Sequence, residues 1–141
     1  MTRRKAVFCC HDRHNDKETS MGFLLVFLGG GIGAALRHGV NLAVARVLGS
    51  GFNYATLFEN VSGSLMMGLL VGYFTFKGTI PQHWRLFLTT GILGGYTTFS
   101  SFSVQTLQEM QKGNWGAAVA NVLLSVVLCL AATWLGWRLA R

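Results

Sequence analysis

Apolar residues occur along the chain in four long runs separated by short polar segments. The runs cover roughly residues 22–48, 54–76, 83–110 and 115–137. Each is long enough to cross the ~30 Å hydrocarbon core of a bilayer, which needs about 20 helical residues. Because the connections are short, neighbouring spans are expected to pack antiparallel. The pattern therefore predicts an all-α integral membrane protein with four transmembrane helices.

The composition agrees with that pattern. Hydrophobic residues make up 51% of the 141-residue chain and charged residues only 12%, whereas a soluble domain carries about 25% charged residues. The net charge of +7 does not indicate nucleic-acid binding, because the basic residues are spread over span ends and an N-terminal segment. We therefore expect the lipid bilayer, and no nucleic acid, as a partner.

The first 20 residues differ from the rest of the chain. They are polar, of mixed charge and without hydrophobic periodicity, which is typical of a disordered tail. They are not a signal peptide, because the apolar run that follows is long and is not closed by a small-residue cleavage site. We predict a tail over 1–20 and a four-span domain over 21–141. Since Met21 directly precedes the first run, the tail is an appended segment or an upstream-start artefact, which the intact mass of the native product distinguishes.

Glycines recur at four-residue spacing within the spans. The pairs are Gly29 with Gly33, Gly68 with Gly72, and Gly91 with Gly95. Small residues at this spacing let helix backbones approach closely in lipid, where no hydrophobic effect drives helices together. The pairs predict a tightly packed bundle and indicate no particular function.

Basic residues outside the tail give only a weak preference for one orientation in the membrane. One side carries Lys77, Arg85, Arg138 and Arg141, and the other carries Arg46 and Lys112. Orientation follows the excess of Lys and Arg, so a bias this small favours insertion in both senses. Counting the basic residues of the tail instead directs the termini towards the cytoplasm.

Polar residues inside the spans are the candidates for function, because they usually face protein or a water-filled path. The third span contains GGYTTFSSFSVQT, in which Phe99 and Phe102 lie three residues apart and share a helix face. Hydroxyl groups supply donors, and an aromatic ring has a positive edge. Two core aromatics are the simpler interpretation of the phenylalanines alone. Together with the hydroxyls, however, they can coordinate a small anion. The preceding glycines of GILGG permit a helix break, where freed carbonyls can hold a cation.

Other intramembrane polar residues have two interpretations each. Asn60 in the second span either donates to an ion or makes an interhelical hydrogen bond. Arg37, on the same helix face as Asn41, either lines an anion-attracting vestibule or contacts helix-end carbonyls. Asn121 and Ser125 in the fourth span fit packing and pore lining equally well.

In the order of these motifs the chain resembles the Fluc (CrcB) family of fluoride channels. The resemblance covers about residues 22–140 and rests on GGGIGAALRH, TLFENVSGSLMMG and, most specifically, GILGGYTTFSSFS. It implies an antiparallel, dual-topology homodimer with a broken third helix and two narrow pores between the subunits. It also implies a fluoride-selective channel of the bacterial inner membrane, through which cytoplasmic fluoride leaves passively, and no enzymatic activity.

The resemblance further implies roles for individual residues. Phe99 and Phe102 would present ring edges to fluoride, and Asn60 would donate its amide in the same pore. Gly94 and Thr97 would offer carbonyl oxygens to a structural Na⁺ ion at the dimer interface. The adjoining polar track would consist of Ser100, Ser101, Ser103 and Thr106.

Arg37 would then lie at the vestibule, and two positions depart from the family pattern. Glu59 directly precedes Asn60 where the family usually has a small apolar residue, and Gln105 stands where many relatives carry Glu. A carboxylate in hydrocarbon costs about 2.5–3.5 kcal/mol, and its charge would repel fluoride if it faced the pore. We predict reduced or pH-dependent fluoride efflux from liposomes relative to Glu59→Val, and we expect position 105 to tolerate the amide.

The alternative function is that of a small four-helix, dual-topology multidrug/proton exporter. Such exporters are also short and glycine-rich, but they depend on a glutamate embedded in the first span. Here the first span has no acidic residue, and Glu59 lies in the second. An enzyme is less favoured, because no Ser/His/Asp set, paired carboxylates or metal ligands share one face. Fluoride efflux against proton-coupled uptake of an organic cation separates the channel from the exporter.

Overall fold

The computed structural model describes residues 13–49, 54–76, 78 and 80–141, and these residues form helices and short connections without any strand. The elements in chain order are α1 (Arg13–Leu48), α2 (Tyr54–Phe76), α3 (Gln82–Arg85), the π-helix η1 (Leu86–Leu93), α4 (Gly94–Tyr96), α5 (Phe99–Gln111) and α6 (Trp115–Leu139). The predicted all-helical class is therefore confirmed.

Three helices in the described part of the chain are long and apolar enough to cross a membrane. They are Glu18–Leu48 within α1, Tyr54–Phe76 and Trp115–Leu139. The third predicted span is divided among α3, η1, α4 and α5, so none of its pieces alone has the length of a span. The number of four spans thus stays a prediction.

Helix α1 begins at Arg13, inside the segment that the sequence indicated as a tail. Neither Gly nor Pro occurs between Arg13 and Met21, so a helix nucleated in the apolar run can extend backwards through these polar residues. Helix α1 therefore runs across residue 20, and the division into a tail and a four-span domain there stays a prediction. The prediction of disorder for residues 1–12 lies outside the described residues.

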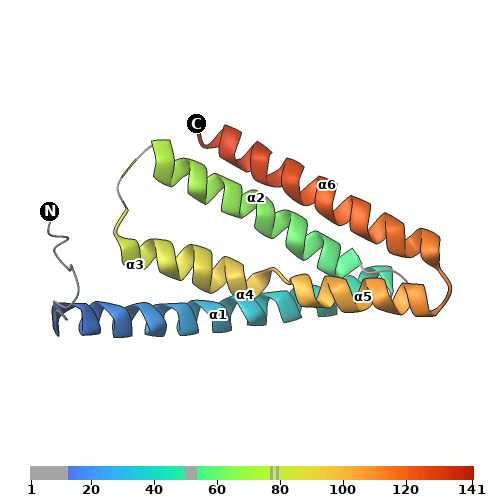
Figure 1. Ribbon diagram of the computed structural model, residues 1–141, viewed down its shortest axis with the longest axis horizontal. Helices are drawn as coiled ribbons and strands as arrows, with labels where there is room; N and C mark the ends of the chain where they lie inside the picture. The colour runs from blue at the N-terminus through green and yellow to red at the C-terminus, as the bar shows by residue number, and fades with distance from the viewer. Residues whose placement is uncertain (1–12, 50–53, 77, 79) are drawn as a thin grey trace, which may run out of the picture.

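The helices form two closely packed groups, which Figure 1 shows as the two sides of a wedge. Helix α1 packs along η1 and α4, while α2 packs along α6. The two groups converge where α5 meets the start of α2, and they diverge where α2 ends and α3 begins (Figure 1). The wedge brings the polar segment of α2 against the junction between α4 and α5.

Glycines make the contacts within both groups, as their spacing predicted. A Cβ atom at Gly29 would lie 2.7 Å from the carbonyl oxygen of Phe87 and 2.9 Å from the Cα atom of Gly91. On the other side of the wedge, a Cβ atom at Gly72 would lie 2.9 Å from the Trp137 carbonyl oxygen. The helix backbones therefore approach so closely that even a methyl group would collide with main-chain atoms.

Candidate functional site

The third predicted span is broken at two extended residues. Thr97 (φ −80°, ψ 154°) and Thr98 (φ −150°, ψ 116°) separate α4 from α5. The predicted break near the middle of this span is therefore confirmed, but it follows the glycines of GILGG rather than falling among them. Gly91 and Gly95 are instead used for close contact with the backbone of α1.

Asn60 of α2 forms hydrogen bonds with the backbone at the break. Its Nδ2 atom donates to the Thr98 carbonyl oxygen at 3.0 Å, and the Thr98 N–H donates to its Oδ1 atom at 2.8 Å. The side-chain amide thereby replaces the backbone partner that Thr98 lacks. The interhelical hydrogen bond that the sequence left open is present, and a second amide N–H remains for another acceptor.

The same contacts release the two carbonyl groups that were predicted to bind a cation. In a continuous helix the N–H of Thr98 would bond to the Gly94 carbonyl, and that of Ser101 to the Thr97 carbonyl. Here the Thr98 N–H bonds to Asn60, and the Ser101 N–H bonds to Thr98 Oγ1 at 3.2 Å. Both carbonyl oxygens have therefore lost their helical donors, which fits a site for a hard cation such as Na⁺.

Thr98 also caps the start of α5 and gathers hydroxyl groups there. Its Oγ1 atom lies 3.2 Å from Ser100 Oγ and donates to Ser101 Oγ at 3.1 Å. Thr98 was not among the predicted site residues. A Thr directly before a helical run is an N-cap signal, and that signal could have identified it.

The other two residues of the predicted polar track lie in different environments. Ser103 is exposed, and its hydroxyl donates to the Phe99 carbonyl oxygen at 2.9 Å. Thr106 is buried against α6, where its Oγ1 atom accepts a hydrogen bond from Asn121 at 2.8 Å. The structure therefore brings Ser100 and Ser101 together at the break and places Thr106 in the contact with α6.

Phe99 and Phe102 form one pair at the start of α5. Their ring centroids lie 5.3 Å apart, with the ring planes inclined by 49°. Phe102 is only 9% exposed, whereas Phe99 is 77% exposed. The pair shares a face as predicted, and one of its rings projects from the surface of the single chain.

Arg37 lies on α1 one helical turn before Asn41, which joins α1 to α2. Its carbonyl oxygen accepts a hydrogen bond from Asn41 Nδ2 at 3.0 Å, and the same Nδ2 atom donates to Glu59 Oε1 at 2.7 Å. Glu59 is completely buried. Its carboxyl group thus points to α1, while the amide of the next residue, Asn60, points to the break.

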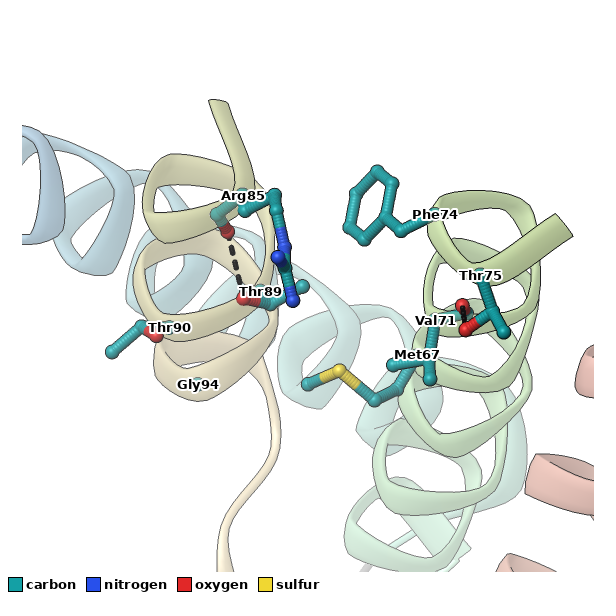
Figure 2. Close-up of a pocket in the computed structure, with 8 residues that line it drawn as sticks. All are labelled: Met67, Val71, Phe74, Thr75, Arg85, Thr89, Thr90 and Gly94. Atoms are coloured by element: carbon teal, nitrogen blue, oxygen red, sulfur yellow. Dashed lines mark hydrogen bonds between the residues drawn. The ribbon is translucent and has the colours of Figure 1, made fainter. Parts of the chain in front are cut away.

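A groove of about 640 Å³ lies between α2 and the α3–η1 segment. Figure 2 shows that Arg85 and Phe74 reach towards each other across its mouth, with the guanidinium 5.6 Å from the ring centroid. Gly94 lies at the opposite end of the lining (Figure 2). The sequence indicated Arg85 only as a charge that orients the protein, and its place on this groove was not predicted.

The comparisons with known proteins identify the family. The model of the family described as "CrcB-like protein, Camphor Resistance (CrcB)" matches residues 24–137. The chain belongs to the CrcB family. The matched CrcB segment includes the break and all the candidate site residues, from Arg37 to Thr106.

Curated relatives agree with the CrcB match. The "Fluoride-specific ion channel FluC" of Rhodopseudomonas palustris (strain BisB5) is 55% identical over 121 residues, which cover 86% of this chain and 98% of the relative. The "Fluoride-specific ion channel FluC 2" of Nitrobacter hamburgensis is 49% identical over the same coverage. A relative from Coxiella burnetii (strain Dugway 5J108-111), also named "Fluoride-specific ion channel FluC", is 46% identical over 123 residues, or 86% of this chain and 98% of its own length.

Proposed function

We propose that this protein is a fluoride-selective ion channel that lets cytoplasmic fluoride leave the cell passively and so lowers its toxicity. The observation that carries the proposal is the gathering of phenyl rings and uncharged donors at one helix break, where Phe99, Phe102 and Asn60 converge on the segment around Thr98. The names of the CrcB relatives support the same ion.

The chemistry of this site suits a small, strongly hydrated anion. A pore must replace the water around the ion with several donors at once, yet bind the ion weakly enough to release it. The free N–H of Asn60, the hydroxyls of Ser100 and Ser101, and the positive ring edges of the phenylalanines are such donors. Because none of them carries a full charge, fluoride can leave as readily as it enters.

A second copy of the chain, inserted in the opposite sense, completes the pathway. Two features of the single chain support this antiparallel homodimer: the ring of Phe99 is 77% exposed, and the groove between α2 and η1 is open. Lipid would solvate neither the hydroxyls of the break nor the Arg85 guanidinium, because hydrocarbon offers no hydrogen bonds. In this assembly the α3–α5 segment crosses the bacterial inner membrane as the third of the four spans of each chain.

A Na⁺ ion would be held by the carbonyl oxygens of Gly94 and Thr97 at the dimer interface. The two oxygens are available because their helical donors bond to Asn60 and to Thr98 instead. Among the described residues no group of three His, Cys, Asp or Glu side chains offers a metal site, so backbone oxygens are the ligands to consider. The ion would supply positive charge that stabilises the broken backbone.

Basic side chains would concentrate the anion at the entrances. Arg37 lies at the α1–α2 contact and is assigned to the vestibule, and Arg85 stands at the mouth of the groove. Positive charge in a recess with low-dielectric walls raises the local concentration of anions. The exporter alternative gains no support, because the relatives are named as channels and the buried Glu59 is bonded to Asn41.

Efflux from liposomes tests the function directly. We expect the reconstituted protein to release fluoride and to retain chloride. Phe99→Ile should lower fluoride efflux about two- to tenfold, because edge contacts of aromatic rings are on the scale of about 0.5–1.5 kcal/mol and each 1.4 kcal/mol is about tenfold. Phe27→Ile is the matched control, since Phe27 on α1 is also 77% exposed. Equal release of both halides, or proton-coupled uptake of an organic cation instead, would refute the proposal.

A further inference from the structure

Two adjacent residues on α2 connect this helix to two different elements. Asn60 bonds to Thr98 at the break, and Glu59 Oε1 accepts a hydrogen bond of 2.7 Å from Asn41 of α1. Consecutive helical residues point about 100° apart, so the two contacts hold α2 from two directions. Since α2 packs chiefly on α6, these contacts attach the α2–α6 pair to the other side of the wedge.

Both side chains of the Glu59–Asn41 contact are held in one orientation. Asn41 uses its amide nitrogen for the Arg37 carbonyl as well as for Glu59, which fixes the direction of the amide group. Glu59 is fully buried. A buried carboxyl group at membrane depth is unfavourable unless a partner satisfies it. The bond to Asn41 is therefore the feature that explains its position.

A second observation concerns buried acceptor oxygens next to α2. Among the described residues, the buried side-chain oxygens without a hydrogen-bond partner are Glu59 Oε2 and Gln105 Oε1. Gln105 reaches α2 as well, because its Nε2 atom donates to Thr56 Oγ1 at 2.8 Å. Thr56 precedes Glu59 by one helical turn, so both residues lie on the same side of α2. An amide at position 59 would add an N–H donor where these buried oxygens lack one.

Glu59 lies in the second turn of α2, and α2 begins where the wedge is closed (Figure 1). The groove is lined by later residues of α2, from Met67 to Thr75. A rotation of α2 about its own axis would carry Asn60 away from Thr98. The close packing of Gly68 and Gly72 on α6 and the 3.0 Å contact between Ser62 Oγ and the Tyr96 hydroxyl limit this rotation on other faces of α2. The bond between Glu59 and Asn41 opposes the same rotation beside the site, because it joins the residue preceding Asn60 to α1. Adjacent contacts of this kind fix the rotation of a helix as well as its position.

We propose that Glu59 is a positioning residue: its carboxyl oxygen, bonded to Asn41, sets the rotation of α2 and thereby holds the Asn60 amide on the broken backbone at Thr98. The role depends on an acceptor oxygen at this place and not on negative charge. The activity readout of this proposal rests on the proposed fluoride-channel function.

Fluoride efflux from liposomes containing the full chain provides the first test. Glu59→Gln keeps the acceptor and should retain wild-type efflux at every pH. Glu59→Leu and Asn41→Leu each remove the bond and should lower efflux about tenfold, as expected when a buried partner is lost. Because both variants break the same contact, the double variant should be no slower than either one. Phe58→Leu, a change at the exposed neighbour on α2, is the control and should leave efflux unchanged.

Three results would overturn the proposal. Glu59→Gln could be as slow as Glu59→Leu, which would show that the acidic group itself is needed. The losses in Asn41→Leu and Glu59→Leu could multiply, which would show two independent roles. The efflux of Glu59→Gln could exceed that of the wild type increasingly as pH rises, which would place the charge of Glu59 on the ion path.

An infrared measurement tests the bond without any ion flux. The carboxyl band of Glu59 is the band that disappears in Glu59→Gln, and it should shift in Asn41→Leu while staying unchanged in Phe58→Leu. A band that does not move in Asn41→Leu would refute the contact even if Glu59→Leu misfolds. If the wild type released no fluoride, the proposed function would fail, whereas the shifted band would still confirm the contact.

Discussion

Helix α1 contacts η1 and α4, and helix α2 contacts the break. Both are close approaches at membrane depth, but they are built differently. The first is backbone against backbone, with Gly29 on Gly91 and Gly95 on Gly30. The second uses side-chain amides and hydroxyls, led by Asn60 on Thr98. In lipid, regular helices need only small residues to associate, whereas a broken helix needs partners for its backbone.

The glycine contact holds the helices of the bundle together, whereas the polar contact prepares the helix break to bind other groups. The glycine contact requires only that the side chains be small, because no polar side chain takes part in it. The polar contact asks for donors and acceptors at fixed places, and it leaves carbonyl oxygens and one amide N–H free for other partners. Substitutions in the first region should therefore act on folding, and those in the second should act on ion flux.

The largest effect is expected from adding a side chain at the glycine contact. Gly29→Leu would place a side chain where even a Cβ atom would lie 2.7 Å from the Phe87 carbonyl oxygen, and overpacking of this kind costs about 1–3 kcal/mol or more. We expect most of the folded protein to be lost, as measured by size-exclusion chromatography and thermal unfolding in detergent. Gly31→Ala is the matched control, because no atom lies within 4 Å of a Cβ atom there. An equally unstable Gly31→Ala would contradict the packing argument.

The next effect is expected at the polar contact. Asn60→Leu leaves the N–H and carbonyl of Thr98 without a partner, and each buried unsatisfied group costs about 1–3 kcal/mol. Fluoride efflux should fall by about 10- to 100-fold, while the yield of folded protein falls much less than in Gly29→Leu. Asn60→Asp keeps the acceptor for the Thr98 N–H and should be intermediate. Thr133→Val, which removes an exposed hydroxyl on α6 bonded to the Cys129 carbonyl of its own helix, should resemble the wild type.

The sequence predicted the regular part of this comparison better than the irregular part. Glycine spacing identified the residues that pack, since the spacing by itself places Gly29 and Gly33 on one helix face. The break was predicted, but its capping residue Thr98 was not. Asn60 was singled out, yet its twofold bond to the Thr98 backbone depends on how α2 is rotated against a distant segment. A single sequence does not specify how α2 is rotated against that segment.

The same limit applies to Glu59 and Arg85. The sequence showed an acid next to the key asparagine, but the direction of its carboxyl group depends on Asn41 of another helix. Arg85 entered only as a charge at a span end, and its place on the groove depends on the divergence of α2 from α3. Long-range pairing of side chains decides both, whereas hydrophobic periodicity carries information only about each helix alone.

A smaller effect is expected where polarity serves packing. Asn121 is 2% exposed and donates to Thr106 Oγ1 at 2.8 Å. Asn121→Leu removes this interhelical bond, which is worth about 0.6–2 kcal/mol in membranes, but Thr106 keeps its bond to the Phe102 carbonyl. We expect a lower unfolding temperature in detergent and a fluoride efflux reduced about two- to fourfold. A loss as large as that of Asn60→Leu would place Thr106 on the ion path itself, as the predicted polar track has it.

The smallest effect is expected from the Glu109–Lys112 ion pair at the end of α5. Its two atoms lie 2.7 Å apart, but the Lys112 side chain is 61% exposed, and exposed pairs contribute only about 0–1 kcal/mol. Glu109 also accepts a hydrogen bond from Asn114, so Lys112→Ala leaves the carboxylate with a partner. Unfolding temperature should change little, the difference should shrink further in high salt, and fluoride efflux should equal that of the wild type. If Lys112→Ala slowed efflux as much as Asn121→Leu, polar groups far from the break would affect ion flux as well. That result would contradict the distinction between packing contacts and the polar contact at the break.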